Sequence, residues 1–223
     1  IGDVKLLDRM IRAQANINAK NKKGVNPLLV ASDEGNSAVA TMLVDANAAI
    51  DVRDSEGFTP LARASIHGHV QLVNILISAK AAVDAHNNTG FAPLMLAVEN
   101  CHIEAIQSLM NARANLEISD AKNGFTALAL AAQQSKTDIL KTLVAAKAEL
   151  DAKSRDGETA LFLAAKQNHI DNAKALLDAR ADVNVRNKDG LDAFKIAMKY
   201  MHEEVARLIA RHSCTCVSEE SEQ

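Results

Sequence analysis

Glycines recur along this chain at a nearly constant interval, and this period constrains its fold more than any other feature. The steps between them are 33, 33, 34, 33 and 33 residues, and the glycines are Gly24, Gly57, Gly90, Gly124, Gly157 and Gly190. Each opens a similar phrase, such as GFTPLARAS at 57 and GFTALALAA at 124. Repeats of this length are typical of solenoids, whose small units bury apolar surface only by stacking on their neighbours. The period therefore predicts one continuous stack of repeats and an extended binding surface.

The repeat around Gly57 predicts two short helices joined by turns. Residues 54–57 read Asp-Ser-Glu-Gly and have the composition of a turn. Thr59-Pro60 is typical of a helix N-cap followed by the first helical position, and a first helix is expected to reach about Ile66. Apolar residues at helical spacing then predict a second helix over about 70–78.

Three apolar positions recur in every repeat and form the candidate core. Aromatic residues make up only 3% of the chain and tryptophan is absent, so this core depends on small aliphatic side chains that let thin helices stack closely. The first helices share two positions three residues apart, and the second helices share one: Leu28, Leu61, Leu94, Leu128, Leu161 and Phe194; Ala31, Ala64, Ala97, Ala131, Ala164 and Ala197; Leu43, Leu76, Leu109, Leu143, Leu176 and Ile209.

This pattern resembles the ankyrin repeat family, whose repeat reads D-x-x-G-x-T-P-L-H-x-A-A-x-x-G-H before an apolar helix and a V-N-A exit. Residues 54–86 match it with Thr59-Pro60-Leu61 and Gly68-His69. The resemblance implies an all-α ankyrin-repeat solenoid of stacked helix pairs with projecting β-hairpin-like turns, in a family that binds proteins and rarely catalyses reactions. It predicts a single domain over 1–212, with a half repeat 1–20, the repeats 21–53, 54–86, 87–119, 120–153, 154–186 and 187–212, and an acidic, disordered tail over 213–223.

The chain departs from the family most clearly where a glycine should follow each second helix. Other residues stand there, namely Gln14, Asn47, Lys80, Arg113, Lys147 and Arg180. If the left-handed turn is kept, each costs roughly 1 kcal/mol relative to glycine. The four cations among them are read as groups that offset the helix dipole, by about 0.3–1 kcal/mol each, in preference to a functional basic stripe.

The position after the turn glycine holds the first candidate binding residues. Phe58, Phe91 and Phe125 follow three of these glycines, and exposed aromatics in a row could anchor a partner. The alternative is that each ring packs on the neighbouring turn. The turns also carry an excess of basic residues over acidic ones, of which Arg155 is the candidate for partner contact.

The ends of the first helices hold the second group of candidates. Here the chain places Ile66-His67, Glu99-Asn100, Gln133-Gln134 and Lys166-Gln167, between the acidic Asp33-Glu34 and the basic Lys199-Tyr200. Such a charge gradient could orient an incoming segment and raise its rate of association. Solvated variation without partner preference is an equally good interpretation.

Other classes of function find little support in the sequence. The motifs GxxxxGK[ST], GxGxxG, HExxH and GxSxG are absent, so we expect no catalytic, cofactor-binding or metal-binding residues and no enzyme activity. Histidines in adjacent repeats should lie roughly 10 Å apart, too far to share one zinc ion, and we expect them to be structural. A net charge of −3 argues against nucleic acid as a partner, and the lack of a long apolar run argues against direct membrane insertion.

The sequence therefore predicts a non-catalytic adaptor or scaffold that binds a protein partner across its turn tips and inner helical face. Two alternatives stay open, a permanent structural subunit of a large assembly and a regulatory segment of a longer enzyme or channel. We expect the domain to be monomeric outside any assembly. Three cysteines are too few for a disulfide framework, which favours an intracellular, cytoplasmic setting. The start at Ile1 suggests missing upstream sequence, so an organellar location stays open.

The last repeat is expected to act as a polar cap on the stack. It has Glu203 and Ala210 where earlier repeats place larger apolar residues.

Overall fold

A computed structural model describes residues 4–219 of the chain, and every regular element in that range is helical. The only β-type pairing found there is an isolated bridge between Ser119 and Thr126. The prediction of an all-α fold is confirmed for this part of the chain. Its internal contacts divide the chain into two compact units, Ile1–Ile118 and Ser119–Gln223, which are described separately below. Their boundary falls one residue before the predicted start of the repeat 120–153.

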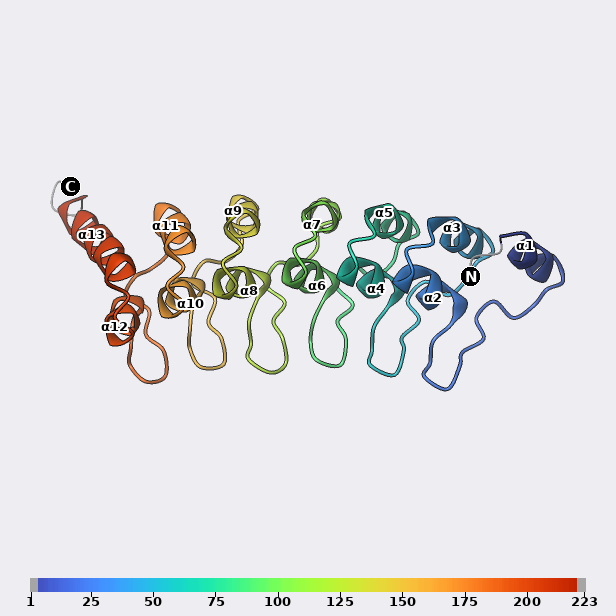
Figure 1. Ribbon diagram of the computed structural model, residues 1–223, viewed down its shortest axis with the longest axis horizontal. Helices are drawn as coiled ribbons and strands as arrows, with labels where there is room; N and C mark the ends of the chain where they lie inside the picture. The colour runs from blue at the N-terminus through green and yellow to red at the C-terminus, as the bar shows by residue number, and fades with distance from the viewer. Residues whose placement is uncertain (1–3, 220–223) are drawn as a thin grey trace. The chain divides into compact units, whose positions relative to one another are not determined.

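Unit 1 contains one single helix and three helix pairs (Figure 1). In chain order they are α1 (Val4–Arg12), α2 (Pro27–Asp33), α3 (Ser37–Asp45), α4 (Pro60–Ile66), α5 (Val70–Ser78), α6 (Pro93–Glu99) and α7 (Ile103–Asn111). The first helices α2, α4 and α6 pack side by side in one layer, and α1, α3, α5 and α7 pack side by side in a second layer. The predicted half repeat and the next three repeats each contain the helices expected of them.

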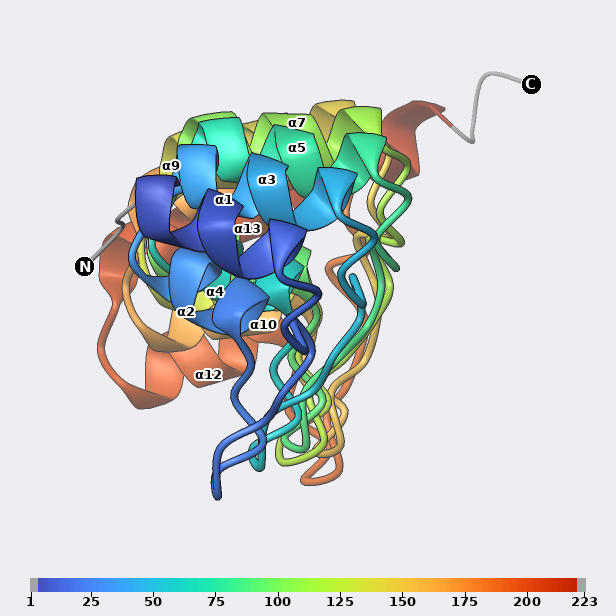
Figure 2. The ribbon, with the colours of Figure 1, turned by 90° about the vertical axis from the view of Figure 1, so that its right-hand side faces the viewer.

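Unit 2 repeats this arrangement with three pairs. They are α8 (Ala127–Gln133) with α9 (Thr137–Ala145), α10 (Ala160–Lys166) with α11 (Ile170–Asp178), and α12 (Ala193–Lys199) with α13 (Glu203–Glu219). Helix α10 packs between α8 and α12, and α11 packs between α9 and α13. Within each unit the connecting loops project from the same side of the helices (Figure 2).

Side-chain caps explain where the first helices begin. The hydroxyl of Thr59 accepts a hydrogen bond from the backbone N–H of Ala62 at 3.2 Å, and Pro60 stands at the first helical position. The same capping position is filled by Asn26, Thr126, Thr159 and Asp192 in other repeats. Such caps satisfy backbone donors that lack a partner inside the helix. The predicted bounds of both helices in the repeat 54–86 are confirmed.

The predicted apolar ladders form the core of each unit, with one exception. In unit 1, Leu61, Ala64 and Leu76 are fully buried. In unit 2, Leu128 and Leu143 are buried in the same way. The exception is Phe194 in α12, whose side chain is exposed, because no first helix packs on the far side of α12 among the described residues.

The left-handed turn after each second helix survives without glycine. Lys80, Arg113, Lys147 and Arg180 have φ values of 67°, 63°, 66° and 69°. Their N–H groups bond back into the helix, as Lys147 does to the carbonyl oxygen of Val144 at 2.9 Å. Each of these residues therefore has a left-handed backbone conformation that glycine tolerates better. The backbone strain expected from the sequence is thus present.

The projecting loops are hairpin-like turns closed by a side chain at their base. In the turn 54–58 the carboxylate of Asp54 accepts hydrogen bonds from the N–H groups of Glu56 and Phe58, both at 2.9 Å. Neighbouring turns are linked through their backbones, since the N–H of Asn88 donates to the carbonyl oxygen of Glu56 at 3.0 Å. In unit 2 the N–H of Arg155 donates in the same way to Asn123 at 2.7 Å. The turns are thus ordered features on which side chains can be positioned.

The end of the repeat domain at residue 212 stays a prediction, and the last helix runs past that residue. Helix α13 continues through Glu219, because the segment after His212 contains neither proline nor glycine to end it. The hydroxyl of Ser213 bonds to the carbonyl oxygen of Ile209 at 3.1 Å, within the helix. The remainder of the predicted acidic tail, residues 220–223, lies outside the described residues.

Candidate protein-binding surface

The structure does not present the three phenylalanines of the turns as exposed anchors. Phe125 is 7% exposed and belongs to the core of unit 2, so the prediction of an exposed ring is wrong there. Phe58 and Phe91 in unit 1 are half-buried. Their backbone N–H groups are held by the side chains of Asp54 and Asn87, each at 2.9 Å, which fixes the start of the first helix. A packing role is thus the better interpretation for Phe125, while Phe58 and Phe91 keep a partly accessible ring.

In unit 1 a charged network joins a turn tip to the ends of two first helices. The guanidinium carbon of Arg63 lies 4.3 Å from the centre of the Phe58 ring, at cation–π distance. Arg63 also contacts Asp54 at 2.6 Å and Asp33 at 3.7 Å. Asp33 in turn lies 3.2 Å from Nε2 of His67. The structure therefore brings the predicted residues Phe58 and His67 into one connected patch.

The remaining predicted residues of unit 1 lie at the ends of α4 and α6. Ile66 is half-buried, and its carbonyl oxygen accepts a hydrogen bond from Nε2 of His102 at 2.9 Å. Glu99 and Asn100 are exposed, and the Asn100 amide donates to the carbonyl oxygen of Leu96 at 2.9 Å. These side chains present carboxylate, amide and imidazole groups to solvent on a buried apolar base.

The predicted binding residues of unit 2 are richer in amide and basic side chains than those of unit 1. Gln134 and Gln167 are exposed, and Gln133 is half-buried at the end of α8. Lys166 is not free, because its Nζ lies 2.8 Å from Oε1 of Glu158. This hydrogen bond raises the pKa of Lys166 above its ordinary value of 10.5. The ammonium group is thus fixed in charge and position.

Arg155 is the predicted basic contact on a turn of unit 2. Its residue is exposed, while its backbone is held by the neighbouring turn through Asn123. A well-placed backbone with an exposed guanidinium is compatible with partner contact. Phe91 and Arg155 belong to different units, and a shared binding surface for them stays a prediction.

The sequence reasoning missed Arg63 as a member of the surface. Arg63 stands where the other repeats have aliphatic residues, namely Val30, Leu96, Leu130, Leu163 and Ile196. This single departure from an apolar ladder was the signal that could have identified it. The sequence indicated Asp33 only as part of the acidic end of a charge gradient. Its contacts with Arg63 and His67 are seen only in the structure.

The histidines that follow the first helices are structural, as expected. Nδ1 of His169 donates to the carbonyl oxygen of Ala132 at 3.0 Å, and Nδ1 of His202 donates to that of Ala165 at 2.9 Å. In unit 1, Nε2 of His69 lies 3.2 Å from the carbonyl oxygen of Asp33. Each histidine therefore satisfies a carbonyl at the end of the first helix of the preceding repeat. Among residues 4–213, whose side chains the structure describes, no group of three or more His, Cys, Asp or Glu side chains is arranged to hold a metal ion.

The expectation of a polar cap at the last repeat is wrong for α12 and the turn that follows it. Phe194, Met198 and Tyr200 are exposed, and Met201 is 84% exposed. At the positions of Phe194 and Met198, the preceding repeat has the fully buried Leu161 and Ala165. The polar residues seen in the sequence belong to α13, whereas the exposed apolar side chains belong to α12 and the turn after it.

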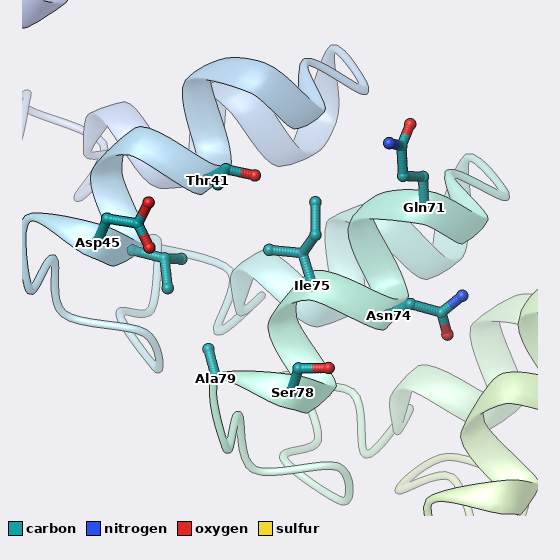
Figure 3. A pocket seen from close by; sticks show the side chains of 8 residues that line it. Thr41, Asp45, Gln71, Asn74, Ile75, Ser78 and Ala79 are labelled. Carbon is teal, nitrogen blue, oxygen red and sulfur yellow. The ribbon is translucent and has the colours of Figure 1, made fainter.

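Unit 1 also has a groove in its layer of second helices. It has a volume of about 520 Å³ and lies between α3 and α5, where Thr41 and Asp45 face Gln71 and Ile75 (Figure 3). We call it the α3–α5 groove, and its lining consists of Thr41, Val44, Asp45, Gln71, Asn74, Ile75, Ser78 and Ala79. None of these residues was predicted as a binding residue.

In each unit, paired helices stack through a common apolar ladder and expose unlike side chains at equivalent positions. This arrangement defines a repeat protein of the solenoid class. The family model for ankyrin repeats (3 copies) matches residues 1–87, 79–154 and 131–220. The chain therefore belongs to the ankyrin repeat family, whose members are protein–protein interaction modules.

Comparison with solved structures supports the same fold. The crystal structure of the ankyrin repeat domain of Bcl-3, described as a unique member of the IkappaB protein family, matches with a TM-score of 0.83. The match has 22% sequence identity and covers 92% of this chain and 91% of that chain. At this identity the similarity shows the fold alone. No curated protein matches the sequence significantly. None of the helices that the structure describes has the length and apolar character needed to cross a membrane.

Proposed function

We propose that this chain is a non-catalytic adaptor or scaffold that binds a protein partner through its turn tips and the ends of its first helices. The observation that carries this proposal is the exposed residue just after each first helix. In four successive repeats it is His67, Asn100, Gln134 and Gln167, on helices whose other faces share the same buried Leu and Ala ladders. Packing constrains the ladders and leaves these positions free to differ, so their chemistry can serve recognition.

The charges within each unit suggest which parts of a partner each unit binds. In unit 1 the helix ends include Asp33, Glu34 and Glu99, which favour a basic segment. In unit 2 they include Lys166 and Lys199, which favour an acidic or amide-rich segment. The two units would thus favour partner segments of different charge.

An intracellular setting is part of this proposal. Cys101 is a free, exposed thiol, and such thiols persist in reducing compartments. The partner would be a protein in the same compartment.

Site-specific photo-crosslinking tests the proposal directly. The crosslinking amino acid p-benzoylphenylalanine replaces Asn100 or Gln134 on the proposed surface, and Lys147 or Arg180 at the far ends of second helices as controls. We expect Asn100 and Gln134 to crosslink one common protein that the controls do not capture. Crosslinks from the control positions alone would refute the assigned surface. An association that survives high salt would instead support a permanent subunit of a larger assembly.

A further inference from the structure

The two second helices of unit 1 that line the α3–α5 groove carry little charge. Along α3 and α5 the only charged residue is Asp45. The equivalent helices of unit 2, α9 and α11, carry five, namely Asp138, Lys141, Asp171, Lys174 and Asp178. Solvated protein surfaces are rich in such charges, whereas the cores of protein interfaces are depleted of them. The contrast between two equivalent places in one chain indicates a surface adapted to contact.

Several polar residues that line this groove have side chains without partners of their own. The side chains of Gln71, Asn74 and Ser78 make no hydrogen bond or ion pair to any other residue in the range 4–213, where side chains are described, and neither does the Asp45 carboxylate. Figure 3 shows Gln71 and Ile75 on α5, across the groove from Thr41 and Asp45, while the Asn74 side chain points away from α3. Amide and hydroxyl groups of this kind both donate and accept hydrogen bonds.

The floor of the groove is apolar. Val44 from α3 and Ile75 from α5 are half-buried there, with Ala79 just beyond the end of α5. At the position of Ile75, α11 has the smaller Ala175. The α3–α5 groove therefore combines an aliphatic contact area with neutral hydrogen-bonding groups and one carboxylate.

We propose that the α3–α5 groove is a second docking site, which binds an extended segment of a protein partner through an aliphatic side chain and a neighbouring Arg or Lys. An extended backbone has unpaired N–H and C=O groups that the Gln71 amide can satisfy, whereas a helical segment has already paired its own. The aliphatic side chain covers Val44 and Ile75, and the basic side chain pairs with Asp45. A volume of about 520 Å³ is in the range of established ligand sites. This site lies on the second helices and is independent of the surface proposed above.

Selection from a library of random peptides tests the proposal without assuming a particular partner. Phage-displayed random dodecapeptides are selected on the full chain, with the double variant Asp45→Lys, Asn74→Lys in excess as a soluble competitor. Both substitutions are compatible with the fold, because equivalent positions already hold Arg211 and Lys174. Peptides that survive this competition depend on the groove.

We expect the surviving peptides to be enriched in Arg or Lys next to Leu, Ile or Val. Asp45→Lys should weaken the Kd of the best synthetic peptide at least tenfold, and that peptide should shift the NMR signals of the Ile75 and Val44 methyl groups. The control change Ala145→Lys, at the position of unit 2 that corresponds to Asp45, should alter the Kd less than twofold. The proposal is overturned if no peptide survives the competition, if the survivors lack basic residues, or if the methyl signals of Ile75 and Val44 do not move.

Discussion

The ammonium group of Lys166 and the carboxylate of Glu158 form an ion pair at 2.8 Å that links a helix end to the turn before it. Only 10% of the Glu158 side chain is exposed, against 34% for Lys166. A carboxylate this buried needs a partner, because an unpaired charge in a protein interior is costly. The pair is therefore structural as well as part of the candidate binding surface.

Lys166→Met should destabilise unit 2 by about 1–2 kcal/mol at neutral pH, since it leaves Glu158 unpaired. The folded pKa of Lys166 lies above the unfolded value of 10.5, so the contribution of the pair is complete below pH 10.5 and is lost as pH rises through the folded pKa. Urea unfolding at neutral pH and above pH 11 measures both effects. The double variant Lys166→Met, Glu158→Gln should recover part of the loss. Equal stability of the single and double variants would contradict a buried-charge penalty.

Asp151→Asn should stabilise the protein at neutral pH by less than about 1 kcal/mol. Burial of the Asp151 carboxyl raises its pKa, and repulsion from Asp182 and Glu149 adds to this. The ionised form therefore costs stability as pH rises through the unfolded value of 3.8 and up to the folded pKa. Asparagine keeps the oxygen that accepts the N–H of Asp182 at 3.0 Å.

The chain already uses asparagine in this role, as Asn18 accepts the N–H of Ala49 at 2.8 Å. The gain should disappear below pH 3.8, where Asp151 is protonated in both states. Thermal unfolding of the variant and of the wild type across this pH range gives the measurement. A gain that persists at low pH would mean that charge is not its cause.

How far the sequence could predict the fold depends on how local the cause is. The bounds Pro60–Ile66 and Val70–Ser78 follow from a cap, a proline and an apolar period, all of which act within a few residues. The burial of Phe125 and the exposure of Phe194 depend instead on which elements pack around each ring. The same residue type in a repeated pattern thus has opposite surroundings, which periodicity does not encode.

The candidate site shows the same limit. The sequence identified the exposed residues Asn100, Gln134 and Gln167 because each follows a helix at a regular position. It could not show that Arg63 joins Asp33, Asp54 and Phe58, because these contacts connect residues from two successive repeats. The α3–α5 groove was missed for a related reason, since its lining comes from two second helices.

Phe125→Ala should destabilise the protein by about 3–5 kcal/mol, as expected for loss of a buried phenylalanine ring. Phe91→Ala, at a half-buried ring, should cost less. Urea unfolding of the two variants gives the comparison. If Phe125→Ala instead leaves stability within about 0.5 kcal/mol and abolishes partner binding, the ring is an exposed anchor after all.

Lys147→Gly should be more stable than Lys147→Gln by about 1 kcal/mol, because only glycine relieves the left-handed backbone at φ 66°. Both substitutions remove the same positive charge from the end of α9, so the helix-dipole effect cancels in the comparison. Glutamine is a fair reference, since Gln14 occupies the equivalent position at φ 55°. Chemical denaturation distinguishes the two. Equal stability would show that the surrounding structure absorbs the strain.

Gly57→Ala should destabilise the protein more than Gly190→Ala, although both glycines have a left-handed backbone, at φ 84° and 74°. At Gly190 an added methyl group meets no atom within 4 Å, so the cost is the backbone strain alone, about 1–2 kcal/mol. At Gly57 the methyl group would lie 2.8 Å from the backbone nitrogen of Asn88, in the neighbouring turn. That nitrogen donates to Glu56, so the turn–turn hydrogen bond would have to shift.

Thermal unfolding of the two alanine variants measures the difference. Hydrogen exchange at the amide of Asn88 reports whether the link between the turns has opened. We expect faster exchange there in Gly57→Ala and no change in Gly190→Ala. The same loss of stability in both variants, with exchange at Asn88 unaltered, would mean that contact between neighbouring turns contributes nothing to the stack. The turns would then stabilise each repeat only through their own backbone conformation.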